Sequence, residues 1–263
     1  MSLRSDMHVS RAVFRRELRS VVINRYFQVF SALALLGGVA ALLFAEDANA
    51  TGFFILQVAL YFVSLFSLLA GVSSAQGERE EWPLLLSQPL RRRTFVICKF
   101  FALFSIFGSV LLLLFVPAFF AGATLASLAL LFSQTLLLAA AFVALGLACG
   151  FLARDRAQAL ITAVSAWLLM LVGIDLVALF AARWPVLQRV PEIWTACLML
   201  NPLDAFRIEA LFALQQIPAE AAGTTPLAAW WIAHAALWFG FIALVWAGAL
   251  THFASARLKQ WEG

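Results

Sequence analysis

The sequence predicts an all-α polytopic membrane protein with six transmembrane helices. Of its 263 residues, 64% are hydrophobic and only 12% are charged, which is about half the charged fraction of an ordinary soluble domain. The apolar residues gather in runs of roughly twenty, the length that crosses ~30 Å of hydrocarbon as a helix. Only helices satisfy their own backbone hydrogen bonds in lipid, and no alternating pattern of a membrane β-barrel occurs. We therefore expect one transmembrane domain over 1–263.

Six apolar runs are expected to span the membrane. They are 27–45, 53–75, 95–120, 125–152, 157–182 and 227–253. The first run is followed by Ala48-Asn49-Ala50, which resembles a signal-peptide cleavage site. That run is longer than the apolar region of a signal peptide, so we interpret it as a retained span.

The basic residues predict how the spans are oriented. They concentrate in the N-terminal segment, in the second and fourth loops and at the C-terminus, which a six-span chain places on one side. The net charge of +4 therefore indicates orientation rather than affinity for nucleic acid. Because cytoplasmic loops are enriched in Lys and Arg, we expect a multi-pass protein of the bacterial inner membrane with both termini in the cytoplasm.

The segment before the first span, 1–26, is expected to form an amphipathic helix. Within RAVFRRELRSVVINRY, the apolar residues share one helical face: Phe14, Leu18, Val21 and Val22. Arginines 15, 16 and 19 point elsewhere. This pattern favours a helix in the cytoplasmic interface with its arginines among lipid phosphates. The alternative is an ordinary basic flank that only sets the topology.

The loop between the second and third spans, 76–94, has an ordered pattern of its own. In EREEWPLLLSQPLRRR, three acids precede Pro83, three leucines follow it, and Pro89 and three arginines close the segment. Acids near a helix N-terminus and a proline at the first helical position predict a short cytoplasmic helix. Its exposed leucines need a cover, either the rest of this chain or another subunit.

The loop between the fifth and sixth spans, 183–226, is expected to be helical and extracytoplasmic. Asn201 suits a helix N-cap, Pro202 the first helical position and Asp204 the first turn. In the preceding span, Asp175 is an ionisable group of a kind that usually faces a bundle interior. It is expected to line a transport path or a dimer seam, or alternatively to reach water or Arg183 at the outer boundary.

The sequence offers little material for catalysis or for a metal site. The three cysteines have no paired spacing. Cys197 and Met199 are soft ligands without a nearby histidine, and His234 and His252 lie at opposite ends of the last span. Catalytic residues, a metal and a cofactor bound by this chain are therefore not expected. Arg154-Asp155-Arg156 is interpreted as a tight turn or, alternatively, a second partner contact.

The 76–94 loop resembles the coupling loop of ABC-2 type transporter permeases, a resemblance carried by Glu78, Glu80, Leu84, Pro89, Arg91–Arg93 and Lys99. Trp82-Pro83-Leu84 stands where the family usually has Gly-Thr-Leu. The basic first segment, the six spans and the long outer loop also fit the family. The resemblance assigns contact with a separate ATP-binding subunit to Glu78, Glu80, Glu81, Trp82, Pro83, Leu84, Leu85, Pro89 and Arg91.

This family resemblance implies a homodimer on two copies of an ATP-binding subunit, which holds the ATP and Mg. The chain lacks G-x-x-x-x-G-K-[ST], so it is not expected to be the ATPase. GIDLVALFA (173–181) and LNPLDAFRIEAL (200–211) are similar to the branch that serves maturation of nitrous oxide reductase, a copper enzyme.

That branch implies export of a sulfur species and contact with a periplasmic accessory protein. The residues expected at this contact are Asn201, Pro202, Asp204, Phe206 and Arg207. The alternatives are an ABC-2 exporter of lipid, peptide or drug, a non-ABC membrane scaffold or transporter, and, least supported, a membrane-embedded enzyme.

Overall fold

The computed structural model describes residues 3–44, 47–77, 92–120, 124–181, 183, 191–214 and 225–258. These residues contain helices and no strand. Six helices are long and apolar enough to cross a membrane: Phe27–Phe44, Asn49–Gln76, Arg92–Phe119, Leu125–Leu152, Arg156–Val177 and Ala235–Arg257. The prediction of an all-α protein with six spans is confirmed.

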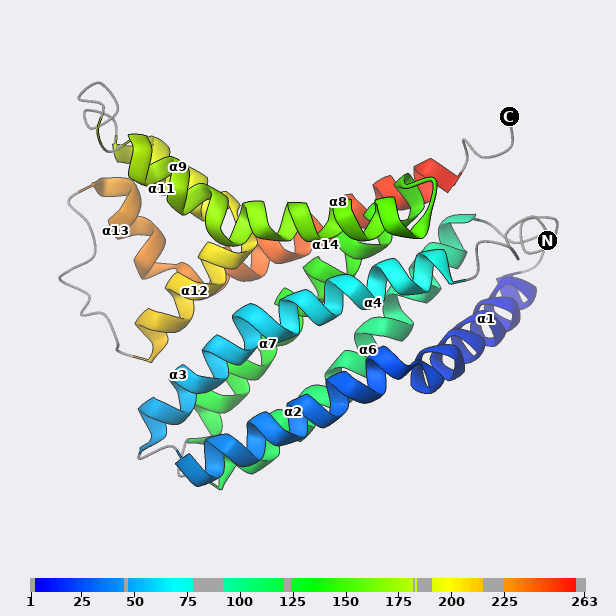
Figure 1. The fold of residues 1–263 in the computed structure, drawn as a ribbon, viewed down its shortest axis with the longest axis horizontal. Coiled ribbons are helices and arrows are strands. Elements are labelled where there is room, and N and C mark those ends of the chain that lie inside the picture. Colours follow the sequence, from blue (N-terminus) through cyan, green and yellow to red (C-terminus); the bar gives the residue numbers. More distant parts are fainter. Residues whose placement is uncertain are drawn as a thin grey trace.

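The helices follow one another in a simple order (Figure 1). They are α1 (Leu3–Ile23), α2 (Arg25–Phe44), α3 (Ala48–Val58), the π-helical turn η1 (Ala59–Val63), α4 (Ser64–Gln76), α6 (Arg92–Phe119), α7 (Leu125–Leu152), α8 (Arg156–Leu168), the π-helical turn η3 (Leu169–Gly173), α9 (Ile174–Ala181), α11 (Pro191–Leu200), α12 (Pro202–Ala213), α13 (Pro226–Ala233) and α14 (Ala235–Arg257). The second span comprises α3, η1 and α4, and the fifth comprises α8, η3 and α9.

The bundle has two distinct ends (Figure 1). Helix α1, the start of α6 and the last turns of α14 lie at one end, and α11, α13 and the start of α3 lie at the other. We name these the inner and outer ends, after the orientation that the arginines predict. The cytoplasmic placement of the inner end stays a prediction.

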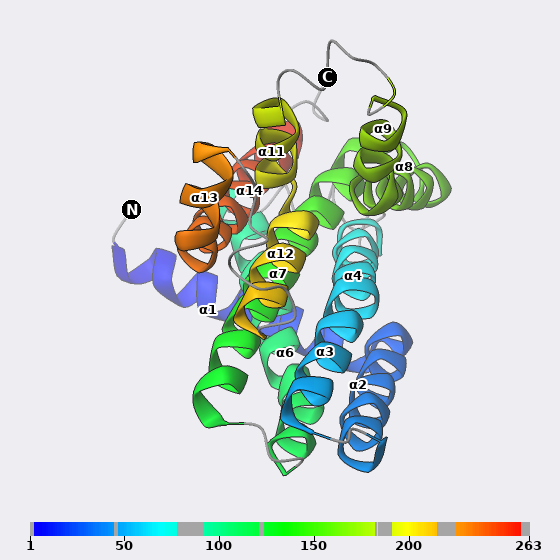
Figure 2. The same cartoon turned by 90° about the vertical axis from the view of Figure 1, so that its left-hand side faces the viewer.

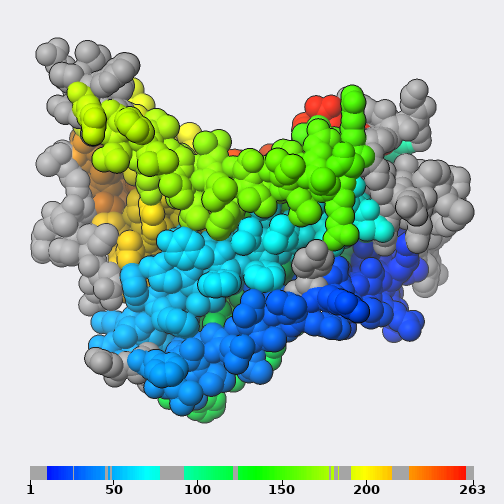
Figure 3. Space-filling view, in the orientation of Figure 1, coloured from blue at the N-terminus to red at the C-terminus, as the bar shows by residue number. Residues whose placement is uncertain are grey.

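Helix α7 is the centre of the bundle, and 83% of its most apolar 18-residue stretch is buried. Helices α4 and α14 pack along it, and α6 joins them (Figure 2). By contrast, only 11% of the corresponding stretch of the fifth span is buried. Figure 3 shows this span, α8 to α9, laid across the surface with its outer face uncovered.

Small residues let α4 and α7 approach closely. A Cβ atom on Gly71 would lie 2.5 Å from the Val143 carbonyl oxygen, and one on Gly146 would overlap the Leu68 carbonyl oxygen. Close contact of helix backbones through glycines is typical of membrane helix packing, where dispersion contacts drive association.

Gly146→Ala is therefore expected to destabilise the protein by about 1–3 kcal/mol, the usual cost of overpacking. The new methyl group meets backbone, which cannot rotate away. Gly108→Ala on α6 is the matched control, because its Cβ would lie an ordinary 3.6 Å from Leu136 Cδ1. Thermal unfolding in detergent should show a lower Tm for Gly146→Ala alone; equal Tm values for the two variants would contradict the close approach.

The last span differs from its prediction. The sequence predicted one helix over 227–253, but the structure breaks it at His234, whose φ of −124° and ψ of 20° are not helical. The His234 Nδ1 atom lies 2.9 Å from the Trp230 carbonyl oxygen, a side-chain hydrogen bond at the break. Thr225 caps α13 and Pro226 begins it. The spanning helix therefore starts at Ala235.

Candidate functional site

The residues assigned to ATPase coupling lie outside the described residues. They are Glu78, Glu80, Glu81, Trp82, Pro83, Leu84, Leu85, Pro89 and Arg91. The structure describes the two ends between which they are held, Gln76–Gly77 at the close of α4 and Arg92 at the start of α6.

Both flanks of this loop are tied to other spans. The Gln76 side-chain amide donates to the Gly150 carbonyl oxygen near the end of α7. The Arg92 guanidinium donates to the Leu258 carbonyl oxygen after α14, at 2.9 Å. Hydrogen bonds to charged groups are stronger than neutral ones. A displacement of the loop would therefore reach α7 and α14 as well as α4 and α6.

A buried ion pair lies beside the loop flanks. Lys99 Nζ on α6 lies 2.7 Å from Glu17 Oε2 on α1, and the two side chains are 1% and 2% exposed. The ammonium also lies 3.5 Å from Ser74 Oγ near the end of α4. A cavity of about 120 Å³ adjoins the pair, with Asn24 and Ser73 among its lining residues. The pair thus joins α1 to both sides of the loop.

Sequence reasoning found Lys99 but missed Glu17. Glu17 sits among the arginines of α1 and was not singled out in the sequence. The sequence feature that could have identified Glu17 is that it is the one acid between Arg11 and Arg25. Buried charges require a partner, so an isolated acid on the apolar side of such a helix indicates a basic residue elsewhere.

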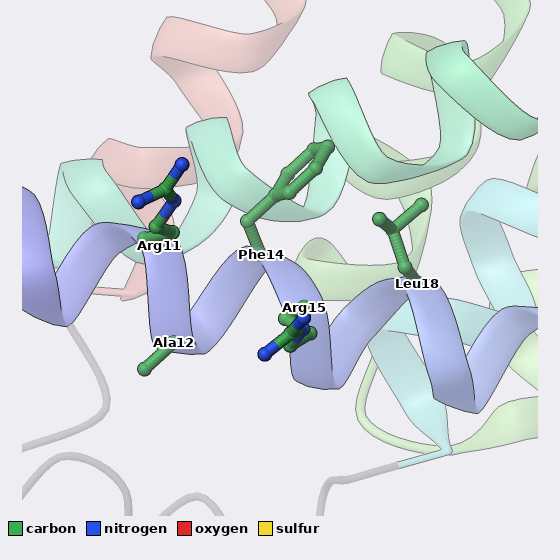
Figure 4. Close-up of a pocket in the computed structure, with 5 residues that line it drawn as sticks. All are labelled: Arg11, Ala12, Phe14, Arg15 and Leu18. Carbon is green, nitrogen blue, oxygen red and sulfur yellow. The ribbon is translucent and has the colours of Figure 1, made fainter.

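Helix α1 confirms the predicted amphipathic helix. Leu18 packs on the core and Val21 is buried in it, whereas Val22 is exposed, so the apolar face is narrower than predicted. Figure 4 shows Phe14 and Leu18 on the same side of the helix. With Arg11 and Arg15 they line an open cavity of about 610 Å³.

At the outer end, four polar side chains form one network. The Arg207 guanidinium of α12 lies 2.8 Å from Asp204 Oδ1 and 3.3 Å from Asp175 Oδ2 in the fifth span. The Asn201 amide donates to Asp204 and, at 2.6 Å, to the Met170 carbonyl oxygen of η3. The network therefore holds the start of α12 against the π-helical turn of the fifth span.

The residues that the sequence predicted to act at this end differ in how far they are buried. Asn201 caps α12 as predicted, and Pro202 lies in its first turn. Asn201, Pro202, Asp204 and Phe206 are all buried within the chain, whereas Arg207 is 31% exposed and Asp175 is 48% exposed. Burial raises the pKa of Asp204 to about 6, against the opposing effects of Arg207 and Asn201. The accessible chemistry of the network is thus an Asp175–Arg207 ion pair.

Glu209 is a second residue that sequence reasoning missed. It is only 3% exposed, and its Oε2 atom has no hydrogen-bond partner among the described residues. Burial raises the pKa of this carboxyl group to about 7. The sequence feature that could have identified Glu209 is its position three residues after Phe206, on the apolar face of the predicted helix. No group of three His, Cys, Asp or Glu side chains that could hold a metal ion occurs in the described part of the chain.

A curated relative covers this chain almost end to end. It is named Probable ABC transporter permease protein NosY, from Pseudomonas aeruginosa, and is 28% identical over 276 aligned positions, which are 97% of this chain and 99% of the relative. The chain resembles an ABC transporter permease. No protein-family model matches it. Because the match is nearly complete, the permease resemblance covers the six spans, the segment between α4 and α6 and the outer helices alike. It agrees with a multi-pass membrane protein that acts in transport.

Proposed function

We propose that the chain is the transmembrane permease subunit of an ABC exporter in the bacterial inner membrane. The observation that carries the proposal is the end-to-end similarity to an ABC transporter permease, joined to a six-span bundle. ATP hydrolysis belongs to a separate subunit that binds ATP and Mg, since the sequence contains no P-loop. The chain itself contributes no catalytic residue and binds no cofactor.

Coupling runs through the loop after α4. Two ATP-binding subunits contact the acids, prolines and leucines of 78–91, and nucleotide-driven closure moves these loops. Gln76 and Arg92 pass the movement to α7 and α14, and the Lys99–Glu17 pair passes it to α1. Packed helices respond to such a push by moving as rigid bodies between discrete arrangements. ATP state and the conformation of the spans are thereby linked.

Two copies of the chain form the translocating unit. The poorly buried fifth span supports this, since its exposed apolar face includes Ile161, Leu169 and Phe180. Asp175 lies in the same span and belongs to the dimer seam or to the transport path. An accessory protein at the outer end would contact Arg207, the exposed member of the predicted set.

The proposed cargo is a sulfur species used in copper-enzyme maturation. This rests on the similarity of 173–181 and 200–211 to the permeases that serve nitrous oxide reductase. Export of a lipid, peptide or drug is the alternative, which an apolar opening between the spans toward the bilayer would favour.

Purification of the tagged chain from native membranes in mild detergent tests the proposal. A P-loop ATPase should co-purify, and Leu84→Asp with Leu85→Asp should remove it, because two new charges would have to be desolvated at an apolar contact. Arg183→Asp changes the net charge by the same two units at an exposed position beyond α9, at the outer end of the bundle, and should retain the ATPase. A chain that purifies alone and binds no added ATPase would contradict the exporter proposal.

A further inference from the structure

A groove of about 370 Å³ runs between α6, α7 and α14. Helix α6 contributes residues from Arg93 to Phe104, and α14 contributes residues from Leu244 to Ser255. Helix α7 contributes Leu137 and Ala140. All three helices are membrane spans, and no residue of the outer network lines the groove.

The groove exists because the facing side chains are small. Ala140 and Ala247 are buried against Phe100 and Phe104. A Cβ atom on Gly248 would meet nothing within 4 Å. Void space of this kind forfeits dispersion contacts, so the helices gain stability if a ligand fills it.

The chemistry of the groove changes along its length. Its inner end is polar, since it holds Arg93 from the first turn of α6 and His252 and Ser255 from the last turns of α14. The remainder is apolar, toward Phe104 and Leu244. Eleven residues separate Arg93 from Phe104, which is about 16 Å along a helix. This length is about half the ~30 Å hydrocarbon thickness, so the groove spans one leaflet.

We propose that this groove binds one anionic phospholipid from the leaflet at the inner end of the bundle. One acyl chain fills the apolar part beside Gly248, and the phosphate lies by Arg93 and His252. Basic residues at the end of a pocket between spans are suited to anionic head groups. Thr251 supports this placement, because its hydroxyl is buried without a hydrogen-bond partner among the described residues and lines the groove.

Native mass spectrometry of the delipidated full chain, titrated with phosphatidylglycerol or phosphatidylcholine of the same acyl chains, tests the proposal. Phosphatidylglycerol should bind more tightly. Arg93→Gln should reduce this preference about fivefold, since one arginine near an anionic lipid contributes ~1 kcal/mol. Arg257→Gln is the matched control, because Arg257 stacks over Phe253 in the last turn of α14, outside the groove lining.

Gly248→Leu tests the acyl site separately. The leucine fills open space without a backbone clash and should displace both lipids, while Tm stays the same or rises. Ala249→Leu on the same helix adds a leucine at an exposed position outside the groove lining and should leave lipid binding unchanged. Unchanged binding in Gly248→Leu, or equal affinity for the two lipids, would overturn the proposal. Loss of a dimer in Gly248→Leu would overturn it as well, by assigning the groove to a second copy of the chain.

Discussion

Lys99→Met is expected to destabilise the protein by about 3–5 kcal/mol, the usual cost of removing one member of a buried ion pair. Glu17 would lose the ammonium that lies 2.7 Å from its Oε2 atom and would remain as a charge that is 1% exposed. Ser74 Oγ, which lies 3.5 Å from the ammonium in the wild type, is neutral and would not replace the lost positive charge. Glu17→Met should cost a similar amount for the same reason. Unfolding in detergent at neutral pH, followed by tryptophan fluorescence, measures both changes.

The double variant, Glu17→Met with Lys99→Met, should recover most of the loss. Two apolar side chains of similar length leave no buried charge, and such replacements are often neutral or stabilising. The double-mutant cycle then gives the coupling between the two positions. Arg19→Met, on the exposed side of α1, is the control and should change stability by less than about 0.5 kcal/mol. A cycle with no coupling, or a Lys99→Met variant as stable as Arg19→Met, would show that the pair does not hold α1 to the bundle.

The ion pair also shows which features the local sequence does not predict. Apolar runs of spanning length depend on local composition, so the six spans were predictable. The cap of α12 was predictable too, since Asn201 and Pro202 act on adjacent backbone groups. Glu17 and Lys99 are 82 positions apart, and Asp175 and Arg207 are 32 apart. Their pairing depends on how the helices pack, which no local pattern encodes.

The two π-helical turns, η1 and η3, could not be predicted from the local sequence either. Each inserts a wider turn in an otherwise ordinary apolar run, so the hydrophobic pattern does not reveal it. Remote groups satisfy polar atoms at or next to these turns. The Asn201 amide donates to the Met170 carbonyl oxygen in η3, and the Trp167 indole donates to Ser64 Oγ directly after η1 at 2.9 Å. Such turns are frequent at functional sites, and here they join the second span, the fifth span and α12.

Glu209→Gln is expected to stabilise the protein at pH 8 and to leave it unchanged near pH 4. Burial raises the pKa of the Glu209 carboxyl from 4.5 to about 7 in the folded chain. Between these values the folded state holds a proton that the unfolded state has released, so stability falls as pH rises. The stability that the protonated Glu209 carboxyl contributes is fully present below pH 4.5 and is lost as pH passes through 7. One pKa unit corresponds to about 1.4 kcal/mol, so the gain at pH 8 is roughly 3 kcal/mol.

Tm measured from pH 4 to pH 8.5 in detergent would separate this effect from that of its neighbour. Burial raises the pKa of Asp204 to about 6. The stability of the Glu209→Gln variant should therefore still fall as pH rises, up to about pH 6. The difference between wild type and Glu209→Gln removes that shared decline and should grow between pH 4.5 and 7. Glu192→Gln, an exposed acid on α11, should run parallel to wild type throughout. If Glu209→Gln also ran parallel, the carboxyl group would have to be ionised and paired in the folded protein. Since its Oε2 atom has no partner among the described residues, that result would indicate a cation or a second protein chain against α12.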